Sequence, residues 1–376
     1  MKYPSVFDDI RPFDEEEVVK AMEDIATDKA FPVLARFVFP DKTTDEVRAI
    51  FGTLKSIDDF QTQVMYTANK QIMYRSITNM SVGGMEKLDV EKRYLFVSNH
   101  RDIMLDASLL QNSLKDYGHK TAQITFGANL MRGDIVVNIG KSNKMFRVER
   151  GGNMKAFYES SKHLSDYIRY VITERNESVW IAQRNGRTKN GDDRTDQGIV
   201  KMFCMSKRDD KVQALAELNI VPVSVSYEWE PCDILKAMEL YVSSIKTYEK
   251  TQNEDLHSIL TGILQTKGRV HFEICDPIKI EELESLSDLN SGEYHKRVAK
   301  LLDSRIHSAY RLYPNNYIAY DKRFGVSKYK DRYTEVEKEL FEQRMNVLDT
   351  YPEFDKEQLE EILLDIYSNP VINKEG

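Results

Sequence analysis

The amino-acid sequence predicts an α/β fold in which a mixed, partly parallel sheet is flanked by helices. Short apolar runs typical of strands recur at 94–97, 135–137, 179–182, 220–225 and 270–274. Stretches of helical character lie between them, the longest at 154–173, and such alternation is typical of a parallel or mixed sheet. Pro222 inside its run favours a strand start or a sheet edge. With 376 residues, of which 41% are hydrophobic, the chain can bury a large core.

Helical additions are expected on both sides of this sheet. Asp14 with Glu17 three residues later has the form of an N-cap with a capping box, and Thr334 with Glu337 repeats it. Asp355 is expected to open a final helix. The chain therefore divides into three expected parts, which are an N-terminal helical region (1–88), an α/β domain (89–285) and a C-terminal helical extension packed on the core (286–376).

Nothing in the sequence favours a segment that crosses a membrane. Mean hydropathy is −0.52, and no run of about 18 apolar residues occurs. The first residues are acidic and lack an apolar core, so no secretory signal is expected. Cys204, Cys232 and Cys275 have no zinc-ligand spacing, and the histidines are scattered singly. We therefore expect reduced core cysteines and no metal site.

Charge is distributed unevenly along the chain. The formal net charge of −8 argues against a protein dedicated to nucleic acid, because such proteins usually present a basic surface. The segment 141–201 departs from this average, with 13 Lys and Arg against 8 Asp and Glu. Two interpretations stay open at this point, a local site for an anionic ligand or unevenly distributed solvated charge.

The segment 98–106 is the strongest candidate for catalytic chemistry. An apolar strand is followed at once by His100 and then by two carboxylates, Asp102 and Asp106. Reactive groups of α/β proteins commonly lie in the loops that follow strands. A carboxylate that orients a histidine ring is the usual arrangement of a general base. The alternative is a surface histidine that happens to precede acidic residues.

The segment 144–152 is a second candidate, for anion binding. Arg147 and Arg150 flank a short apolar stretch that runs into Gly151 and Gly152. The planar guanidinium group donates two parallel hydrogen bonds to phosphate, and glycines let backbone N–H groups approach an anion. The alternative is a strand with alternating solvated charges.

The segment 180–191 is a third candidate, also for anion binding. An apolar strand runs into a basic, glycine-containing loop with Asn185, Gly186 and Arg187. A loop of this composition after a buried strand is suited to an anionic ligand. The alternative is an ordinary polar turn.

Taken in order, four segments resemble the glycerol-3-phosphate and lysophosphatidate acyltransferase superfamily. Members carry an N-H-x-x-x-x-D block, an F-I-x-R type block, an E-G-x-R-S block and an apolar segment with a proline. The corresponding residues here are Asn99-His100…Asp106, Phe146-Arg147-Val148-Glu149-Arg150, Asn185-Gly186-Arg187-Thr188 and Ile220-Val221-Pro222-Val223. Their order and spacing cover the stretch from about Leu95 to Tyr227, roughly a third of the chain.

Two positions depart from the family pattern. The family acid lies five residues after the histidine, where this chain has Leu105, so we align Asp106 with a one-residue insertion and keep Asp102 as the fallback. The glutamate of the third block is Asn185, whose amide forms hydrogen bonds without carrying a charge.

The resemblance implies an enzyme that transfers a fatty acyl group from a thioester, acyl-CoA or acyl carrier protein, to a hydroxyl of glycerol-3-phosphate or a lysophospholipid. His100, oriented by Asp106, would act as general base. The implied substrate-binding residues are Arg147, Arg150, Asn185, Gly186 and Arg187. No bound cofactor or metal is implied, and no nucleic acid partner.

The resemblance also implies contact with lipid. We expect a cytoplasmic protein that is peripheral on the inner face of the cytoplasmic membrane. Two other functions stay open: an O-acyltransferase for another lyso-lipid, such as an N-acyl amino acid, and a non-catalytic lipid-binding protein on the same fold. A comparison of acyl transfer to acceptors with and without phosphate distinguishes the first alternative from a glycerophosphate acyltransferase. The absence of any thioester turnover would favour the second alternative.

Overall fold

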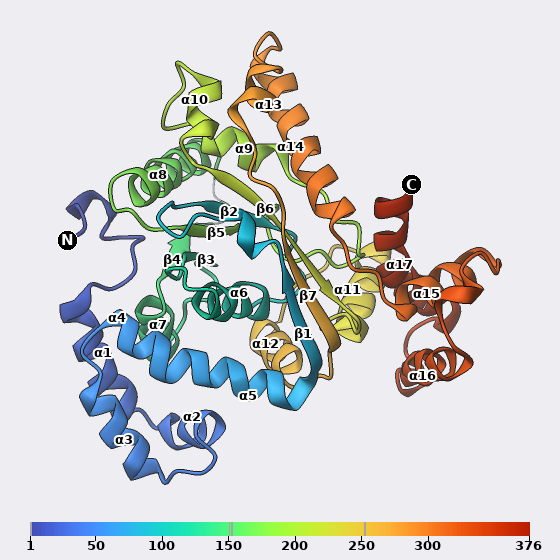
Figure 1. The fold of residues 1–376 in the computed structure, drawn as a ribbon. Helices are drawn as coiled ribbons and strands as arrows, with labels where there is room; N and C mark the ends of the chain where they lie inside the picture. Colours follow the sequence, from blue (N-terminus) through green and yellow to red (C-terminus); the bar gives the residue numbers. More distant parts are fainter. Residues whose placement is uncertain (1, 150, 152, 252) are drawn as a thin grey trace.

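The computed structural model describes residues 2–149, 151, 153–251 and 253–376. A seven-stranded sheet runs through the middle of the molecule, with helices on both of its faces (Figure 1). The N-terminal helices and the last C-terminal helices lie on opposite sides of this centre.

The sheet is mixed and mostly parallel, which confirms the predicted fold class. Its strand order is β1-β7-β6-β2-β5-β3-β4. The strands are β1 (Ile77–Gly83), β2 (Leu95–Ser98), β3 (Gln123–Gly127), β4 (Met145–Val148), β5 (Val179–Ala182), β6 (Ile220–Tyr227) and β7 (Gly268–Ile274). Strands β2 to β6 run parallel, whereas β7 pairs antiparallel with β6 and parallel with β1.

Alternating side chains of β2 supply two separate cores, because neighbouring residues of a strand point to opposite faces of the sheet. Leu95 and Val97 belong to one core and Phe96 to the other, and all three are almost fully buried. The first core includes side chains of α8 (Met154–Thr173), α9 (Gln197–Phe203), α10 (Lys211–Ala216), α13 (Ile280–Glu284) and α14 (Ser291–Ser308). The second includes side chains of α5 (Tyr66–Ser76), α6 (Leu105–Asp116) and α12 (Glu254–Leu264).

The N-terminal region is mainly helical, as predicted. It contains η1 (Ser5–Phe7), α1 (Glu15–Thr27), α2 (Phe31–Val38), α3 (Thr44–Thr53), α4 (Ile57–Asp59) and η2 (Phe60–Met65), which continues into α5. The capping box at the start of α1 is confirmed: the Asp14 side chain accepts from Glu17 N, and the Glu17 side chain accepts from Asp14 N at 2.8 Å.

The C-terminal region is also helical, as predicted. Its helices α15 (Pro314–Phe324), α16 (Glu335–Met345) and α17 (Lys356–Glu375) share a core with α11 (Asp233–Ile245). The predicted N-caps Thr334 and Asp355 both accept backbone hydrogen bonds at the starts of α16 and α17. The remaining short elements are α7 (Asp134–Ser142), η3 (Met85–Lys87), η4 (Lys330–Arg332) and η5 (Asn346–Thr350).

Two secondary-structure predictions are wrong. Residues 135–137, expected as a strand, lie in α7, where Ile139 packs against the N-terminal helices. A run of three apolar residues does not distinguish a strand from a helix. Conversely, strand β1 lies in the region 1–88, which was expected to be helical. The strand was not predicted because a register shift between Ile77 and Asn79 interrupts the alternation of apolar and polar residues by which a strand is recognised.

Pro222 does not lie at a sheet edge, because β6 is flanked by β2 and β7. The ladder with β7 begins at Val223, and the carbonyl of Pro222 accepts from Cys275 N at 3.0 Å. Proline has no backbone N–H, and in this strand that absence falls at the end of the β6–β7 ladder. Pro222 is the third residue of β6, close to the strand start that was the other position predicted for it.

The parallel strands determine where a functional site can form. Strands β2 to β6 all end at one edge of the sheet, so the loops that follow them meet there. Strand β7, which runs in the opposite sense, begins at the same edge. Among the helices of the described residues, none is long and apolar enough to span a membrane.

Lys267 stabilises this edge from inside the protein. It is fully buried, and its ammonium group donates to Ser76 Oγ at 3.0 Å, to Ile263 O at 3.2 Å and to Gln265 O at 2.6 Å. Burial lowers the pKa of Lys267 from its ordinary value of 10.5 to about 8. The unfolded chain therefore binds more protons than the folded chain between these two pH values, so this group makes folding more favourable as pH rises through that window.

We predict that Lys267→Met removes this pH dependence. The free energy of unfolding of the wild type, relative to the variant, should rise by up to about 3 kcal/mol between pH 8 and 10.5. Urea unfolding across this pH range measures the difference. The control variant Lys296→Met, at an exposed lysine, should keep the pH dependence of the wild type. If the difference in unfolding free energy between the wild type and Lys267→Met stays constant across this pH range, the lowered pKa of Lys267 is contradicted.

Candidate functional site

His100 lies in the loop between β2 and α6, where the central parallel strand ends. Its Nδ1 is 2.9 Å from Oδ2 of Asp106, which occupies the first turn of α6. The ring also meets Trp180 of β5 edge to face, with centroids 5.5 Å apart. The imidazole of His100 therefore lies between the Asp106 carboxylate and the Trp180 ring.

The Asp106 carboxylate is fully buried and accepts from three donors besides the histidine. Oδ2 accepts from the backbone N–H groups of Arg101 at 2.6 Å and Asp102 at 2.9 Å, and Oδ1 accepts from Tyr227 Oη at 2.8 Å. An acceptor surrounded in this way favours the tautomer in which Nδ1–H of His100 donates to Asp106. Nε2 then keeps its lone pair, as a general base requires.

Tyr227 stays protonated in this position. Burial, together with the charges of Asp106 and Asp102, raises the pKa of its phenol well above the ordinary value. The hydroxyl is therefore a permanent donor to Asp106, and it connects the end of β6 to the start of α6.

Asp102, the fallback partner, has a different place in the loop. Its Oδ1 accepts from Met104 N at 2.9 Å and Leu105 N at 2.8 Å, so it caps the start of α6. Burial and then the charge of Asp106 raise its pKa, which favours the neutral acid. Of the two aspartates, the structure brings Asp106 to the His100 ring.

Asn99 fixes the strand end that carries His100. Its amide nitrogen donates to Val225 O at 2.9 Å and to Asp193 Oδ2 at 3.0 Å, and its amide oxygen accepts from Val225 N at 2.8 Å. Thr188 N also donates to His100 O at 2.8 Å, so the loop after β5 is held against the histidine.

A buried ion network lies behind the same loop. Arg101 Nη2 is 2.7 Å from Asp193 Oδ2, and Nη1 is 3.3 Å from Glu230 Oε2. Lys236 pairs with Glu230 and donates to Arg101 O at 2.7 Å. Burial by itself would raise the pKa of Asp193, but Arg101 and its hydrogen-bond donors lower it below the ordinary value. The charges therefore keep the loop in one conformation.

His100 opens onto a cavity of about 320 Å³ at the carboxyl edge of the sheet. Its lining includes apolar residues, among them Ile103, Met104, Ala107, Ile124, Leu130 and Met145. It also includes polar and charged residues, among them Arg184, Asn185, Arg187, Lys189, Lys250 and the carboxylate Asp255. A cavity lined by apolar residues and four cationic side chains suits a ligand that combines a hydrocarbon with an anionic group.

The structure brings Asn185, Gly186 and Arg187 to the same cavity as His100. Gly186 has a φ of +76°, a left-handed conformation that glycine adopts without strain. Nη1 of Arg187 is buried and makes no hydrogen bond within the described residues. An arginine side chain that lines a cavity without a carboxylate of the described residues within 4 Å is suited to an anion.

Arg147 is not part of this cavity. Its side chain is half-exposed on β4, pairs with Glu149 at 2.7 Å, and lines a separate hollow against α8. The physical reason is that β4 is an edge strand whose first two residues, Met145 and Phe146, are buried, whereas burial ends at Arg147. Arg150, predicted as a further substrate ligand, lies outside the described residues.

Sequence reasoning did not assign Tyr227 to the site, and it included Arg184 and Lys189 only as members of the basic loop 180–191 without roles of their own. Tyr227 completes the hydrogen bonds of Asp106, and Arg184 and Lys189 line the cavity. Each follows an apolar run at the carboxyl edge of the sheet, and that position is the signal that would have found them. Lys189 is paired with Glu239, whereas no carboxylate lies within 4 Å of Arg184 or Arg187 in the described part of the chain.

No metal centre is evident in the described residues. Within residues 2–149, 151, 153–251 and 253–376, no three His, Cys, Asp or Glu side chains gather as a metal ion would require. Cys204, Cys232 and Cys275 are all buried and unpaired with one another.

Comparison with known proteins gives one family match. Residues 79–226 match the family model described as Acyltransferase. Nothing among the curated proteins matches the chain. Among solved structures, the chain is similar to the 1-acyl-sn-glycerophosphate (LPA) acyltransferase PlsC from Thermotoga maritima, with 15% sequence identity and a TM-score of 0.35 over 76% of this chain and 93% of that one.

Proposed function

Because residues 79–226 match the Acyltransferase family model, we propose that this chain moves a fatty acyl group from a thioester to a hydroxyl of glycerol-3-phosphate or a lysophospholipid. The family match also confirms the resemblance of the four sequence segments. The observation that carries the proposal is the His100–Asp106 pair, 2.9 Å apart, at a cavity shared with Arg187. The proposed donor is acyl-CoA or acyl carrier protein.

The first step is proton transfer from the acceptor hydroxyl to Nε2 of His100. As the proton leaves, the hydroxyl oxygen forms a bond to the thioester carbonyl carbon. The ring becomes an imidazolium, and the Asp106 carboxylate next to Nδ1–H stabilises that charge. Asp106 keeps its own hydrogen bonds throughout, so the ring does not turn away.

The second step is collapse of the tetrahedral intermediate. The carbon–sulfur bond breaks, the carbonyl re-forms, and the thiolate takes the proton from Nε2 of His100. The products are the acylated acceptor and the free thiol, and no covalent acyl-enzyme forms. General-base catalysis contributes about 10²–10⁴-fold, so positioning of the two substrates supplies the rest.

Arg184 and Arg187 supply the positioning. Both line the cavity with His100, and neither has a carboxylate within 4 Å in the described residues. A phosphate of the acceptor can therefore pair with them, which places its hydroxyl near Nε2. The apolar residues of the cavity, among them Met104 and Ile124, suit the acyl chain. Since the product is a lipid, we further propose peripheral contact with the inner face of the cytoplasmic membrane.

We predict that Asp106→Asn lowers kcat/KM for acyl transfer by about 10²–10⁴-fold, because the amide no longer stabilises the imidazolium. Asp102→Asn is the matched control, at the aspartate four residues earlier, in the loop before α6. Its raised pKa favours the neutral acid, which an amide resembles, so this variant should stay within about threefold of the wild type. Release of free thiol from the acyl donor measures both rates. Equal losses in the two variants would contradict the assignment.

We also predict that Arg187→Gln raises KM for glycerol-3-phosphate by about 10–100-fold, the cost of one charged hydrogen-bond partner. An acceptor without phosphate should be almost unaffected. Arg194→Gln, a change at an exposed arginine of the same loop that pairs with Asp192, is the control and should behave as the wild type. A wild-type preference for the phosphate-free acceptor would instead favour an acyltransferase for another lyso-lipid.

A further inference from the structure

A second cavity, of about 570 Å³, shares no lining residue with the cavity of His100. It is formed by the second half of β7, the end of α14, the segment 309–312, Lys87 of η3 and Lys374 in the last turn of α17. Because β7 begins at the carboxyl edge of the sheet, its second half leads away from the active site. The volume lies in the range of small-molecule sites, about 300–1,000 Å³.

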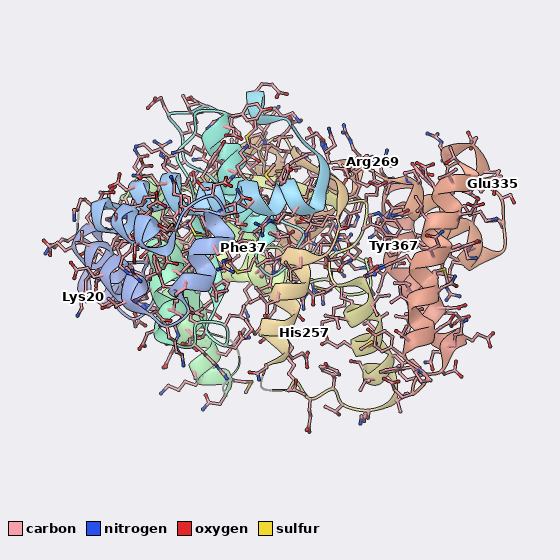
Figure 2. All side chains as sticks on the ribbon, turned by 90° about the horizontal axis from the view of Figure 1, so that it is seen from below. Lys20, Phe37, His257, Arg269, Glu335 and Tyr367 are labelled. Carbon is pink, nitrogen blue, oxygen red and sulfur yellow. The ribbon has the colours of Figure 1, made fainter. Side chains whose placement is uncertain are left out.

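The second cavity belongs mainly to the C-terminal part of the chain. Figure 1 shows the C-terminal end of α17 beside the end of α14. In Figure 2, Arg269 of β7 and Tyr367 of α17 lie on the side of the molecule opposite Lys20 of α1. Apart from Lys87, the lining residues follow residue 226, where the match to the family model ends. The cavity is therefore a feature that the family match does not account for.

The lining carries four cationic side chains against two carboxylates, and two of the cations are already paired. Lys87 Nζ is 3.3 Å from Oε1 of Glu273 and 3.7 Å from Oδ1 of Asp276, so one lysine engages both carboxylates of the cavity. Arg305 pairs at 2.6 Å with Glu282, which does not line the cavity. The two remaining cations have no such partner.

The other oxygen of Glu273 is occupied by a histidine. His271 Nε2 is 3.2 Å from Oε2 of Glu273, and its Nδ1 is 2.8 Å from Ser81 Oγ. Burial, together with the charge of Arg311, lowers the pKa of His271 and favours the neutral ring. The ring then donates from Nε2 to the carboxylate and accepts from the Ser81 hydroxyl at Nδ1. Both oxygens of Glu273 are therefore engaged, one by Lys87 and one by His271.

Arg311 is held in place with one edge of its guanidinium group free. Its backbone N–H donates to Ser226 Oγ at 3.0 Å, and its Nη1 donates to Ser81 Oγ at 3.1 Å. Within the described residues, its Nε and Nη2 make no hydrogen bond and no carboxylate lies within 4 Å of it. The Nε–Nη2 edge can donate two parallel hydrogen bonds to the oxygens of a phosphate. This arginine is therefore preorganised for an oxyanion.

Lys374 is the second cation without a carboxylate partner. Its ammonium group donates to the carbonyl of Tyr310, the residue before Arg311, and makes no ion pair in the part of the chain that the structure describes. Its neighbour Glu375 instead accepts from Tyr329 Oη. Burial and the charge of Arg311, against the opposite effect of Glu375, lower the pKa of Lys374. The two like charges oppose each other here, and an anion between them would remove that repulsion.

The segment that carries Arg311 also supports the catalytic loop. The phenol of Tyr310 donates to Asp193 Oδ2 at 2.6 Å, and the same oxygen is 2.7 Å from Nη2 of Arg101, the residue after His100. A ligand of Arg311 and Lys374 would therefore contact the segment on which this ion network depends.

We propose that the second cavity binds the phosphate group of a small, hydrophilic molecule, with Arg311 and Lys374 as its ligands. Two adjacent cations match a doubly charged phosphate better than a singly charged carboxylate. Ala309 and Leu312 are the aliphatic residues of the lining, so the cavity offers little surface to an acyl chain. The proposal adds a site outside the active centre and does not rest on the proposed function.

The test is calorimetric titration of the purified full chain with inorganic phosphate and with glucose 6-phosphate, at about pH 8 and constant ionic strength. The double variant Arg311→Gln/Lys374→Gln should weaken binding by about tenfold or more, because two charged hydrogen-bond donors are lost. The matched control Lys300→Gln/Arg332→Gln removes the same charge at exposed positions of α14 and η4 and should bind as the wild type. Lys374→Gln alone, at an exposed position, should weaken binding by a smaller factor.

Tighter binding of glucose 6-phosphate identifies an organic phosphate as the ligand, and equal affinity for both probes identifies free phosphate; either result supports the site. The proposal is overturned if the wild type binds neither probe, if Arg311→Gln/Lys374→Gln binds as tightly as the control variant, or if acetate binds as tightly as phosphate. It is also overturned if Arg187→Gln abolishes binding, because the phosphate would then occupy the His100 cavity. The titrations contain no acyl donor, so their result is independent of the proposed acyl transfer.

Discussion

The carboxylate of Asp106 is the interaction on which the rest of the site depends. It accepts from His100, from two backbone N–H groups of the same loop and from Tyr227, so it joins the ends of β2 and β6 to the start of α6. A fully buried carboxylate is costly unless its oxygens are satisfied, and here four donors satisfy them. Because those donors need an acceptor, the proton of the imidazole is held on Nδ1 and Nε2 is left as the base.

The surroundings of this carboxylate connect the catalytic loop to segments that follow it in the chain. Behind the loop, Arg101 joins Asp193 and Glu230, and Tyr310 of the segment after α14 donates to Asp193 at 2.6 Å. Beside the loop, α12 approaches closely through Gly262. The position of the catalytic loop therefore depends on the C-terminal region and on α12 as well as on the sheet.

Much of this arrangement could be predicted from the sequence, and the exceptions have physical causes. Residue types near strand ends indicate chemistry, which is why His100, Asp106 and Arg187 were identified. His100 and Arg187 line one cavity, and Asp106 lies behind the His100 ring. Arg147 was misplaced because the sequence does not show that β4 is an edge strand in which burial ends after Phe146. Tyr227 was missed because its partner is distant in sequence.

The central claim is that His100, held by Asp106, removes the proton from the acceptor hydroxyl. The most direct test is transfer of a labelled acyl group from a thioester to glycerol-3-phosphate, compared between the purified wild type and His100→Ala. We expect the variant to lose at least about 10²-fold in turnover while it keeps the fold of the wild type. Transfer by folded His100→Ala at nearly the wild-type rate would contradict it.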